Sequence, residues 1–401
     1  MKPTEKLSDL GYLQIGKESS VGVAVVPTVA VPLYSETLFT KPMYELDNQI
    51  MGQPFGVYNI FQGQREHTGD ITIMAEPKTL PHFLQMFINK ISSTNNAGVY
   101  THLFQLGAAE ASYTIEFLKG DVTHRYFGCE IESISPEWKS ESVMSLKLNV
   151  SALGSVTVIP LTSASSTTIT PTTDYDPKPA RGLVVGDVLT LVHINGGTQD
   201  TTEQVTILSI ASDYSTITTS SSISGTYSAG DYFYITKRSI TPVVDTPFNW
   251  ARTEFRFGDT ASEALSATAT PLEKGSKFDI TNPFNDKTGE KRSGSFDPVS
   301  FARKPGDAKL TVKKFFNDGK ELNDFVKKNK KACVIRMFGS LVSGSTFNEF
   351  RITLNNTKIV ESPDPLTAGQ IIYLNQTLQA QYDTTDLQAF DINVINGISS
   401  Y

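Results

Sequence analysis

Residues 144–152 read Met-Ser-Leu-Lys-Leu-Asn-Val-Ser-Ala, and residues 372–382 read Ile-Tyr-Leu-Asn-Gln-Thr-Leu-Gln-Ala-Gln-Tyr. Side chains of a β-strand point alternately to the two faces of its sheet, so each stretch predicts a long strand with one apolar face and one polar face. The candidate residues for the polar, solvent-facing side are Ser145, Lys147 and Asn149 in the first strand and Thr377, Gln379 and Gln381 in the second. Lys147 is the one charged residue among them.

The sequence around these two strands recurs in the same order. Residues 13–16 (Leu-Gln-Ile-Gly) resemble residues 255–258 (Phe-Arg-Phe-Gly), and each stretch opens one half of the chain. A Gly-Asp pair and a Ser-Pro pair also occur in both halves, at residues 69–70 and 306–307 and at residues 135–136 and 362–363. This shared order predicts an internal duplication, with one copy in residues 1–160 and the other in residues 239–401.

Each copy is predicted to carry one helix that packs on its sheet. Residues 80–91 place Leu80, Phe83, Leu84, Phe87 and Ile88 at helical spacing, and Pro81 suits a first helical turn. The matching helix, over residues 319–328, carries Leu322, Phe325 and Val326. The predicted fold class is therefore mainly β (α+β), with two β-sandwich or barrel domains that each have one packed helix.

Residues 161–238 separate the two copies. This segment begins with a Ser/Thr-rich run at residues 162–173 and continues with short strand patterns and turn signals. We expect a small all-β domain inserted between two self-sufficient units, with few contacts across its boundary.

Two long stretches, residues 40–68 and residues 281–306, show little regular pattern and occupy matching places in the two copies. Loops of this length are usually functional or disordered. Because their positions match, a shared contact with a neighbouring assembly unit is the predicted role, and its candidate residues are Tyr44, Phe55, Phe284 and Phe296.

Composition and motifs limit the possible functions. The chain has 401 residues and a formal net charge of −7, which speaks against general affinity for nucleic acid. Cys129 and Cys333 are too few for a disulfide framework, and the apolar stretch at residues 21–33 is too short to span a membrane. No nucleophile, metal-ligand or nucleotide motif is present, so we expect no enzyme, no cofactor, no metal site and no membrane insertion.

The opening at residues 11–18 (Gly-Tyr-Leu-Gln-Ile-Gly-Lys-Glu) and the following Val26-Pro27-Thr28 resemble the start of tail tube proteins (major tail proteins) of long-tailed, siphovirus-type bacteriophages. The order of strands, the single helix and the closing strand at residues 142–153 are similar to one tail-tube domain. Residues 248–396 resemble a second, so the resemblance is to the double-domain type. The inserted segment departs from the minimal pattern and resembles small β modules on phage tail surfaces.

The resemblance implies a structural protein of the virion, made in the host cytoplasm. Three chains would form a ring with pseudo-sixfold symmetry, and stacked rings would form a hollow tube that conducts viral DNA without binding it specifically. Implied partners are the tape measure protein, the tail terminator and the distal tail protein. The polar strand faces would then line a negative or near-neutral lumen.

Three other interpretations stay open, one of which is a hydrolase with an unfamiliar site. The polar faces could form the outer surface of a monomeric sandwich. A multi-domain β protein that binds glycans, or adheres to a surface of a virion or a cell, is the alternative function. It would need an aromatic platform or a metal site, and the sequence shows neither clearly.

Overall fold

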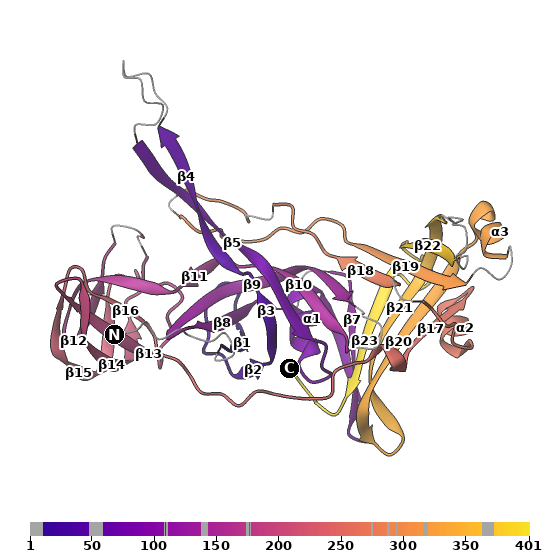
Figure 1. Cartoon of the computed structure of the whole chain (residues 1–401), viewed down its shortest axis with the longest axis horizontal. Coiled ribbons are helices and arrows are strands. Elements are labelled where there is room, and N and C mark those ends of the chain that lie inside the picture. The colour runs from indigo at the N-terminus through magenta and orange to yellow at the C-terminus, as the bar shows by residue number, and fades with distance from the viewer. Residues whose placement is uncertain are drawn as a thin grey trace, which may run out of the picture.

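The computed structural model describes residues 11–47, 59–107, 109, 111–137, 143–173, 176, 178–273, 276–286, 289–293, 295–315, 320–362 and 373–401. Strands account for 60% of the residues and helices for 6%, which confirms the predicted mainly β class. Figure 1 shows the chain as an elongated body, with a small barrel at one end, the first half in the middle and the second half at the other end.

In its described residues, the first half contains eleven strands and one helix. Helix α1 is shorter than predicted and ends at Phe87, where the chain turns into a strand. The elements are β1 (Leu13–Lys17), β2 (Val29–Val31), β3 (Leu33–Glu36), β4 (Phe39–Asp47), β5 (Asn59–Met74), α1 (Leu80–Phe87), β6 (Asn89–Asn96), β7 (Val99–Gln105), β8 (Tyr113–Lys119), β9 (Val122–Glu137), β10 (Ser145–Ser151) and β11 (Gly154–Val156).

The part of the second half that the structure describes contains seven strands, two α-helices and one short 3-10 helix. Its helix α3 places Phe325 against the core, but Val326 is 75% exposed and does not face the sheet as predicted. The elements are η2 (Trp250–Arg252), β17 (Thr253–Gly258), α2 (Ala261–Ser266), β18 (Lys277–Thr281), β19 (Asp307–Phe315), α3 (Lys320–Lys327), β20 (Lys331–Ser343), β21 (Thr346–Glu361), β22 (Tyr373–Ala380) and β23 (Phe390–Asn396).

The two halves share one strand order. In the first half the antiparallel order is β5–β10–β9–β8–β1, and in the second it is β19–β22–β21–β20–β17. A register shift interrupts the pairing of β9 with β10 beside Asn149, and the equivalent shift interrupts that of β21 with β22 beside Thr377. An internal duplication would produce this agreement, because a bulge is a local feature of one strand pair.

The shared bulge gives a residue-by-residue correspondence. Asn149 matches Thr377, and their bulge-side partners Ser133 and Glu361 match each other. The Gly-Asp pairs are not equivalent, because Gly69 lies inside β5 whereas Gly306 precedes β19. The duplication is therefore better defined by strand register than by the short sequence repeats that first indicated it.

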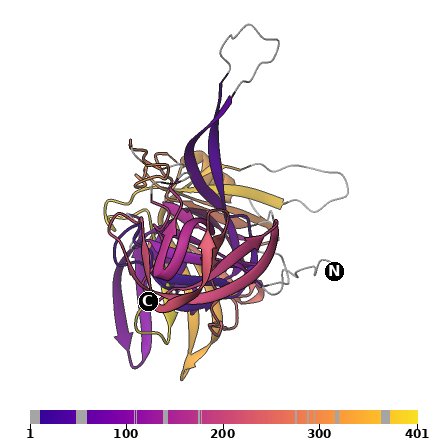
Figure 2. The same ribbon diagram turned by 90° about the vertical axis from the view of Figure 1, so that its left-hand side faces the viewer.

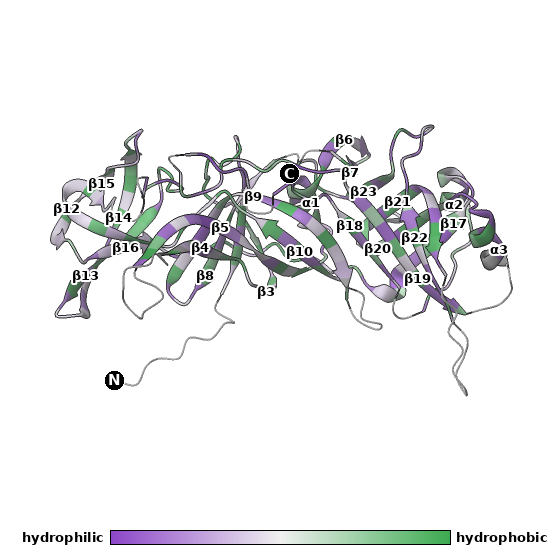
Figure 3. Cartoon of the chain, turned by 90° about the horizontal axis from the view of Figure 1, so that it is seen from above, coloured by the Kyte–Doolittle hydropathy of each residue, from purple (hydrophilic) through white to green (hydrophobic). Residues whose placement is uncertain are grey.

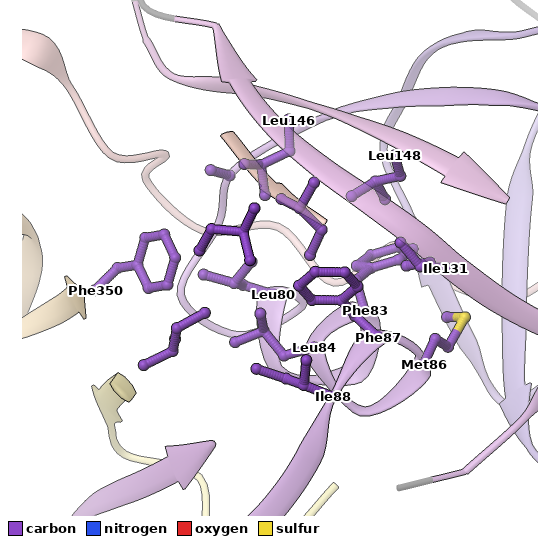
Figure 4. Packing of buried hydrophobic residues seen from close by; sticks show 14 of the residues in the cluster. Leu80, Phe83, Leu84, Met86, Phe87, Ile88, Ile131, Leu146, Leu148 and Phe350 are labelled. Carbon is purple, nitrogen blue, oxygen red and sulfur yellow. The ribbon is translucent and has the colours of Figure 1, made fainter. Parts of the chain in front are cut away.

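The sheet runs without a break from one half into the other. Strand β18 pairs with β9, and β7 pairs with β23, so each half contributes strands to its neighbour. The resulting strand order is β4–β5–β10–β9–β18–β19–β22–β21. Buried side chains from both halves form a single hydrophobic cluster around α1, where Phe83 and Phe87 lie under Leu146 and Leu148 and near Phe350 (Figure 4).

The segment between the halves forms a closed five-stranded barrel with its own apolar core. Its strands, in chain order, are β12 (Val158–Pro171), β13 (Val188–Asn195), β14 (Thr198–Ile210), β15 (Ile217–Ser228) and β16 (Tyr232–Ile235).

The barrel is not independent of the first half, so the prediction of few contacts across its boundary was wrong. Phe127 of β9 and Val156 of β11 belong to the barrel's core cluster. Arg125 of β9 is fully buried and forms ion pairs with Glu116 of β8 and with Asp187 of the barrel, both at 2.6 Å. Apolar burial and buried charge therefore both join the barrel to the first half.

Residues 40–68 were predicted to lack regular structure, and this was wrong for the part that the structure describes. Strands β4 and β5 form a long hairpin, here called the arm, that projects well beyond the body (Figures 1 and 2). The sequence signal was weak because the arm's outer part has no buried face to impose an alternation of apolar and polar residues.

Residues 281–306, here called the strap, connect β18 to β19 and lie against the first half. The side-chain amide of Asn282 donates to the backbone oxygens of Phe87 and Gly107, at 2.8 and 2.9 Å. Arg303 donates to the backbone oxygen of Ile131 and to the carboxylate of Glu130, at 3.0 and 2.6 Å. The strap thus holds the two halves together within one chain.

Candidate functional site: a polar sheet face across both halves

The first strand of the predicted polar face has the expected orientation. Leu146, Leu148 and Val150 of β10 are completely buried, whereas Ser145 and Asn149 are partly exposed and Lys147 is exposed. Apolar and polar residues alternate along the strands of this sheet in Figure 3. The side chains of Ser145, Lys147 and Asn149 therefore lie on the face opposite the core.

Strand β22 has the same orientation in the second half. Leu374 and Leu378 are buried, and Thr377 and Gln379 are partly exposed on the opposite face. Gln381 is exposed, but it lies one residue beyond the end of β22 and its backbone amide bonds to Asn356. Its predicted place on the strand was wrong, because the strand ends at Ala380.

Strands β9, β18 and β19 join these two polar faces into one. Ser133 and Ser135 of β9 lie opposite Asn149 and Lys147 of β10. At the far side, Thr311 and Lys309 of β19 lie opposite Thr377 and Gln379 of β22. The polar face is consequently continuous across the junction of the two halves. These intervening residues were missed, although residues 307–313 (Asp-Ala-Lys-Leu-Thr-Val-Lys) of β19 show a similar alternation.

Three lysines on this face are paired with carboxylates. The ammonium of Lys147 lies 3.0 Å from the carboxylate of Asp70 on the adjacent strand. In the second half, Lys309 lies 3.2 Å from Asp307, and Lys277 lies 3.3 Å from Asp279. Lys147 is thus not the one cation of the whole face, and Lys313 of β19 lies over the ring of Tyr373.

A polar pocket of about 430 Å³ marks the junction of the two halves on this face. Residues of both halves line it, and none of its lining side chains is aromatic. They are Asp70, Glu132, Ser133, Ser135, Lys147, Asn149, Thr281 and Pro283. Small polar groups that exchange readily with water suit a wetted surface better than a specific ligand site.

The arm carries a row of exposed apolar side chains. Tyr44, a predicted contact residue, is 60% exposed, and Leu46 and Ile60 face each other across the hairpin and are similarly exposed. Phe61, next to Ile60, is also more than half exposed. Phe55 lies outside the described residues. Clustered exposed apolar residues on a projecting hairpin indicate a contact surface.

The two strap candidates contact the chain itself. Phe284 is only 3% exposed, stacks on Phe301 at 4.6 Å and lies under the guanidinium of Arg303. Phe296 is partly buried, and its backbone oxygen accepts a hydrogen bond of 2.7 Å from Arg65 of β5. The prediction that Phe284 contacts a neighbouring unit was wrong, and Phe296 packs against the base of the arm instead.

A buried polar cluster fixes the strap to the arm. His67 of β5 bonds to Thr40 at 3.0 Å and to the carboxylate of Asp297 at 3.1 Å. Burial alone would raise the pKa of Asp297, but His67 and the nearby Arg65 and Arg181 hold it below the usual range. The arm's base is therefore held in one orientation by groups from β5, the strap and the barrel.

Reactive groups are scarce in the described part of the chain. Cys129 and Cys333 are buried and free, and burial raises the pKa of both thiols. Among the described residues, no group of three or more His, Cys, Asp or Glu side chains could hold a metal ion. No helix in the described ranges has the length and apolarity needed to cross a membrane.

The continuous polar face and the projecting arm are therefore the most distinctive surface features of the described residues. No known family model matches the chain, and no curated protein matches it.

Proposed function

We propose that this chain is a structural subunit that joins its copies edge to edge into a ring, and that the rings stack into a hollow tube that conducts DNA. This is the role of the bacteriophage tail tube proteins that the sequence resembles. The observation that carries the proposal is the sheet with one continuous polar face, which crosses two halves of the same strand order.

The two open ends of that sheet support a ring. In the described residues, β4 pairs with β5 alone, and β21 has an unpaired edge beyond its last contact with β20. Open strand edges promote association, and closure of a ring removes them. Two matched halves per chain would give a ring of three chains six similar units.

The charge of the polar face suits a lumen for DNA. A wall with clustered lysines would retain the polyanion, because phosphate contacts release counterions and bind tightly at low salt. Here Lys147 of β10, Lys277 of β18 and Lys309 of β19 each lie beside a carboxylate. A near-neutral wall of Ser, Thr, Asn and Gln would let DNA pass without holding it.

The barrel would lie on the exterior of the tube, because the polar face is the only lumen candidate among the described strands and the barrel forms no part of it. In this proposal the mature location is the virion, and the ends of the tube would meet terminating proteins.

Electron microscopy of the purified chain tests the proposal directly. We expect rings or filaments with a central channel, roughly 80–100 Å wide for a barrel of about 24 tilted strands with outer layers. Particles that stay monomeric over a wide concentration range would contradict the proposal and favour a surface-binding protein.

Arginine substitutions test the lumen assignment. Asn149→Arg with Thr377→Arg places new cations at two equivalent positions, and tubes assembled with short duplex DNA should then protect it from nuclease in low salt. Wild-type tubes should protect none. Ser220→Arg with Ser222→Arg, on the exposed barrel surface, is the matched control and should give no protection. Equal protection by both variants would show that the polar face is not the lumen.

A further inference from the structure

The joint between the two halves provides a template for a joint between chains. At this joint, the end of β18 stays paired with β19 on one side and pairs antiparallel with the end of β9 on the other. Ile280 lies opposite Ile134, and Thr281 lies opposite Ser133. Since the halves share one strand order and one bulge, the same two edges recur once more in the chain, at the two ends of the sheet.

The edge of β9 that β18 joins has its equivalent at the end of β21. The bulge correspondence matches Ser133 with Glu361, so Ile134 matches Ser362. In the first half the edge beyond β8 is occupied by β18. In the second half the pairing of β20 with β21 stops at Thr357, and no described strand occupies the edge beyond it.

The end of β18 that joins β9 has its equivalent at the base of the arm. Asp70 lies opposite Asn149, and Thr311 lies opposite Thr377. Because Asn149 matches Thr377, Asp70 matches Thr311. Four residues earlier, Glu66 therefore matches Asp307. Lys41 lies opposite Glu66, as Thr281 lies opposite Asp307, so residues 40–41 correspond to residues 280–281.

We infer that residues 40–41 of one copy pair antiparallel with residues 361–362 of the next copy, which places Lys41 opposite Glu361. The inference rests on the proposed ring and assigns the residues that close it. The partner is a second copy of this chain, because the joint is the chain's own internal joint repeated between molecules.

The chemistry of the two edges supports this register independently. Lys41 and Glu361 are both exposed, and they carry opposite charges. At the internal joint the corresponding residues, Thr281 and Ser133, are uncharged. Opposite charges on facing residues of an antiparallel pair stabilise it, and like charges destabilise it. The joint between chains would thus contain an ion pair that is absent from the joint within a chain.

Among the described residues, a pocket of about 790 Å³ lies beside the open edge. Val312, Ile359 and Leu378 are among its apolar lining residues, and Lys330 and Lys331 are among its charged ones. The three apolar side chains are at most 8% exposed and belong to the main cluster. A neighbouring copy would fill the pocket beside them.

The two joints also differ in one backbone hydrogen bond. The backbone amide of Asn282 donates to the oxygen of Glu132 at the internal joint, at 2.8 Å. Pro42 stands at the position of Asn282 and has no amide hydrogen. The pairing between chains is therefore expected to stop after two residues, where the arm departs from the sheet.

Cysteine cross-linking tests the register. Facing residues of an antiparallel pair are close enough for a disulfide, so Lys41→Cys with Glu361→Cys should link chains on oxidation into closed covalent rings. Lys41→Cys with Lys358→Cys is the off-register control, displaced by roughly 10 Å, and should give no such link. Ser133→Cys with Thr281→Cys should close a disulfide within each chain and serves as the control for folding and oxidation. The natural cysteines are buried and give no background.

Charge reversal tests the ion pair. Lys41→Glu or Glu361→Lys alone should raise the protein concentration needed for ring formation by roughly tenfold, since each joint then opposes like charges. The double reversal should restore most of the assembly, which the loss of an ordinary surface charge would not do.

The outcomes separate this inference from the proposed function. Interchain links at 41 and 361 and rescue by the double reversal support the pairing. Rings or tubes in the microscope without those links would overturn the pairing and leave the ring proposal intact. A chain that never assembles, while the internal cysteine pair closes normally, would overturn both.

Discussion

Replacing Asp187 with alanine is expected to lower the free energy of unfolding by about 3–5 kcal/mol, the range found when one partner of a buried ion pair is removed. Asp187 of the barrel accepts hydrogen bonds of 2.6 and 2.8 Å from Arg125 of β9 and also contacts Arg238. Without Asp187, the buried guanidinium of Arg125 keeps only Glu116 as its carboxylate partner. Urea unfolding measures the effect, and Asp200→Ala, at an exposed position of the same barrel, should leave the midpoint unchanged.

The size of the effect follows from how completely Arg125 is satisfied. Its five N–H groups donate to Glu116 twice, to Asp187 twice and to the backbone oxygen of Gly182 once. Arg125→Met with Glu116→Leu and Asp187→Leu removes the three fully buried charges together and leaves only the partly exposed Arg238. This variant should recover much of the lost stability. A triple variant as unstable as Asp187→Ala would show that apolar contacts, and not the ion pairs, hold the barrel.

The pH dependence of the same variant has a defined sign. Burial raises the pKa of Asp187, but Arg125 and Arg238 more than offset this and hold it below its usual range. A carboxyl group with a depressed pKa in the folded state stabilises the fold above its unfolded pKa of about 4, and this contribution is lost as the pH falls below that value. The wild-type chain should therefore lose more stability than Asp187→Ala between neutral pH and pH 3.

Much of the sheet could be predicted from the sequence because one face of each long strand is buried. Alternation in residues 144–152 identified β10 and the orientation of its side chains correctly. The buried face of α1 was also predicted. Each of these elements has a local periodicity that burial imposes on the sequence.

Other parts depend on contacts between distant residues, which no local pattern reveals. The ion network joins Glu116, Arg125, Asp187 and Arg238, which lie in four separate segments. The strap and the arm occupy equivalent positions between paired strands of the two halves. The strap nevertheless packs against the first half, whereas the arm projects from the body. The difference arises because the strap lies against the first half of the same chain, where Phe284 is buried and Arg303 bonds to Ile131 and Glu130.

Shortening the arm is expected to stop tube elongation without preventing ring formation. Replacing residues 44–61 with Asn-Gly, a sequence that favours a two-residue hairpin turn, would keep Pro42 opposite Arg65 and leave the contacts of the strap in place. It would remove Tyr44, Leu46, Ile60 and Phe61, whose side chains are all more than half exposed. Burial of each such side chain at a neighbouring ring would contribute roughly 1.5–3 kcal/mol. Their joint loss should therefore abolish stacking.

Point substitutions make the same test without changing the length of the arm. Tyr44→Ser with Phe61→Ser removes two exposed aromatic rings, and Gln62→Ser, at a neighbouring exposed position, is the matched control. Microscopy should show mostly single rings for the double variant and full tubes for the control. Lys41 stays in place in all of these variants, so ring closure is unaffected by design. Tubes of normal length from the shortened chain would show that stacking uses another surface and that the arm has a different partner.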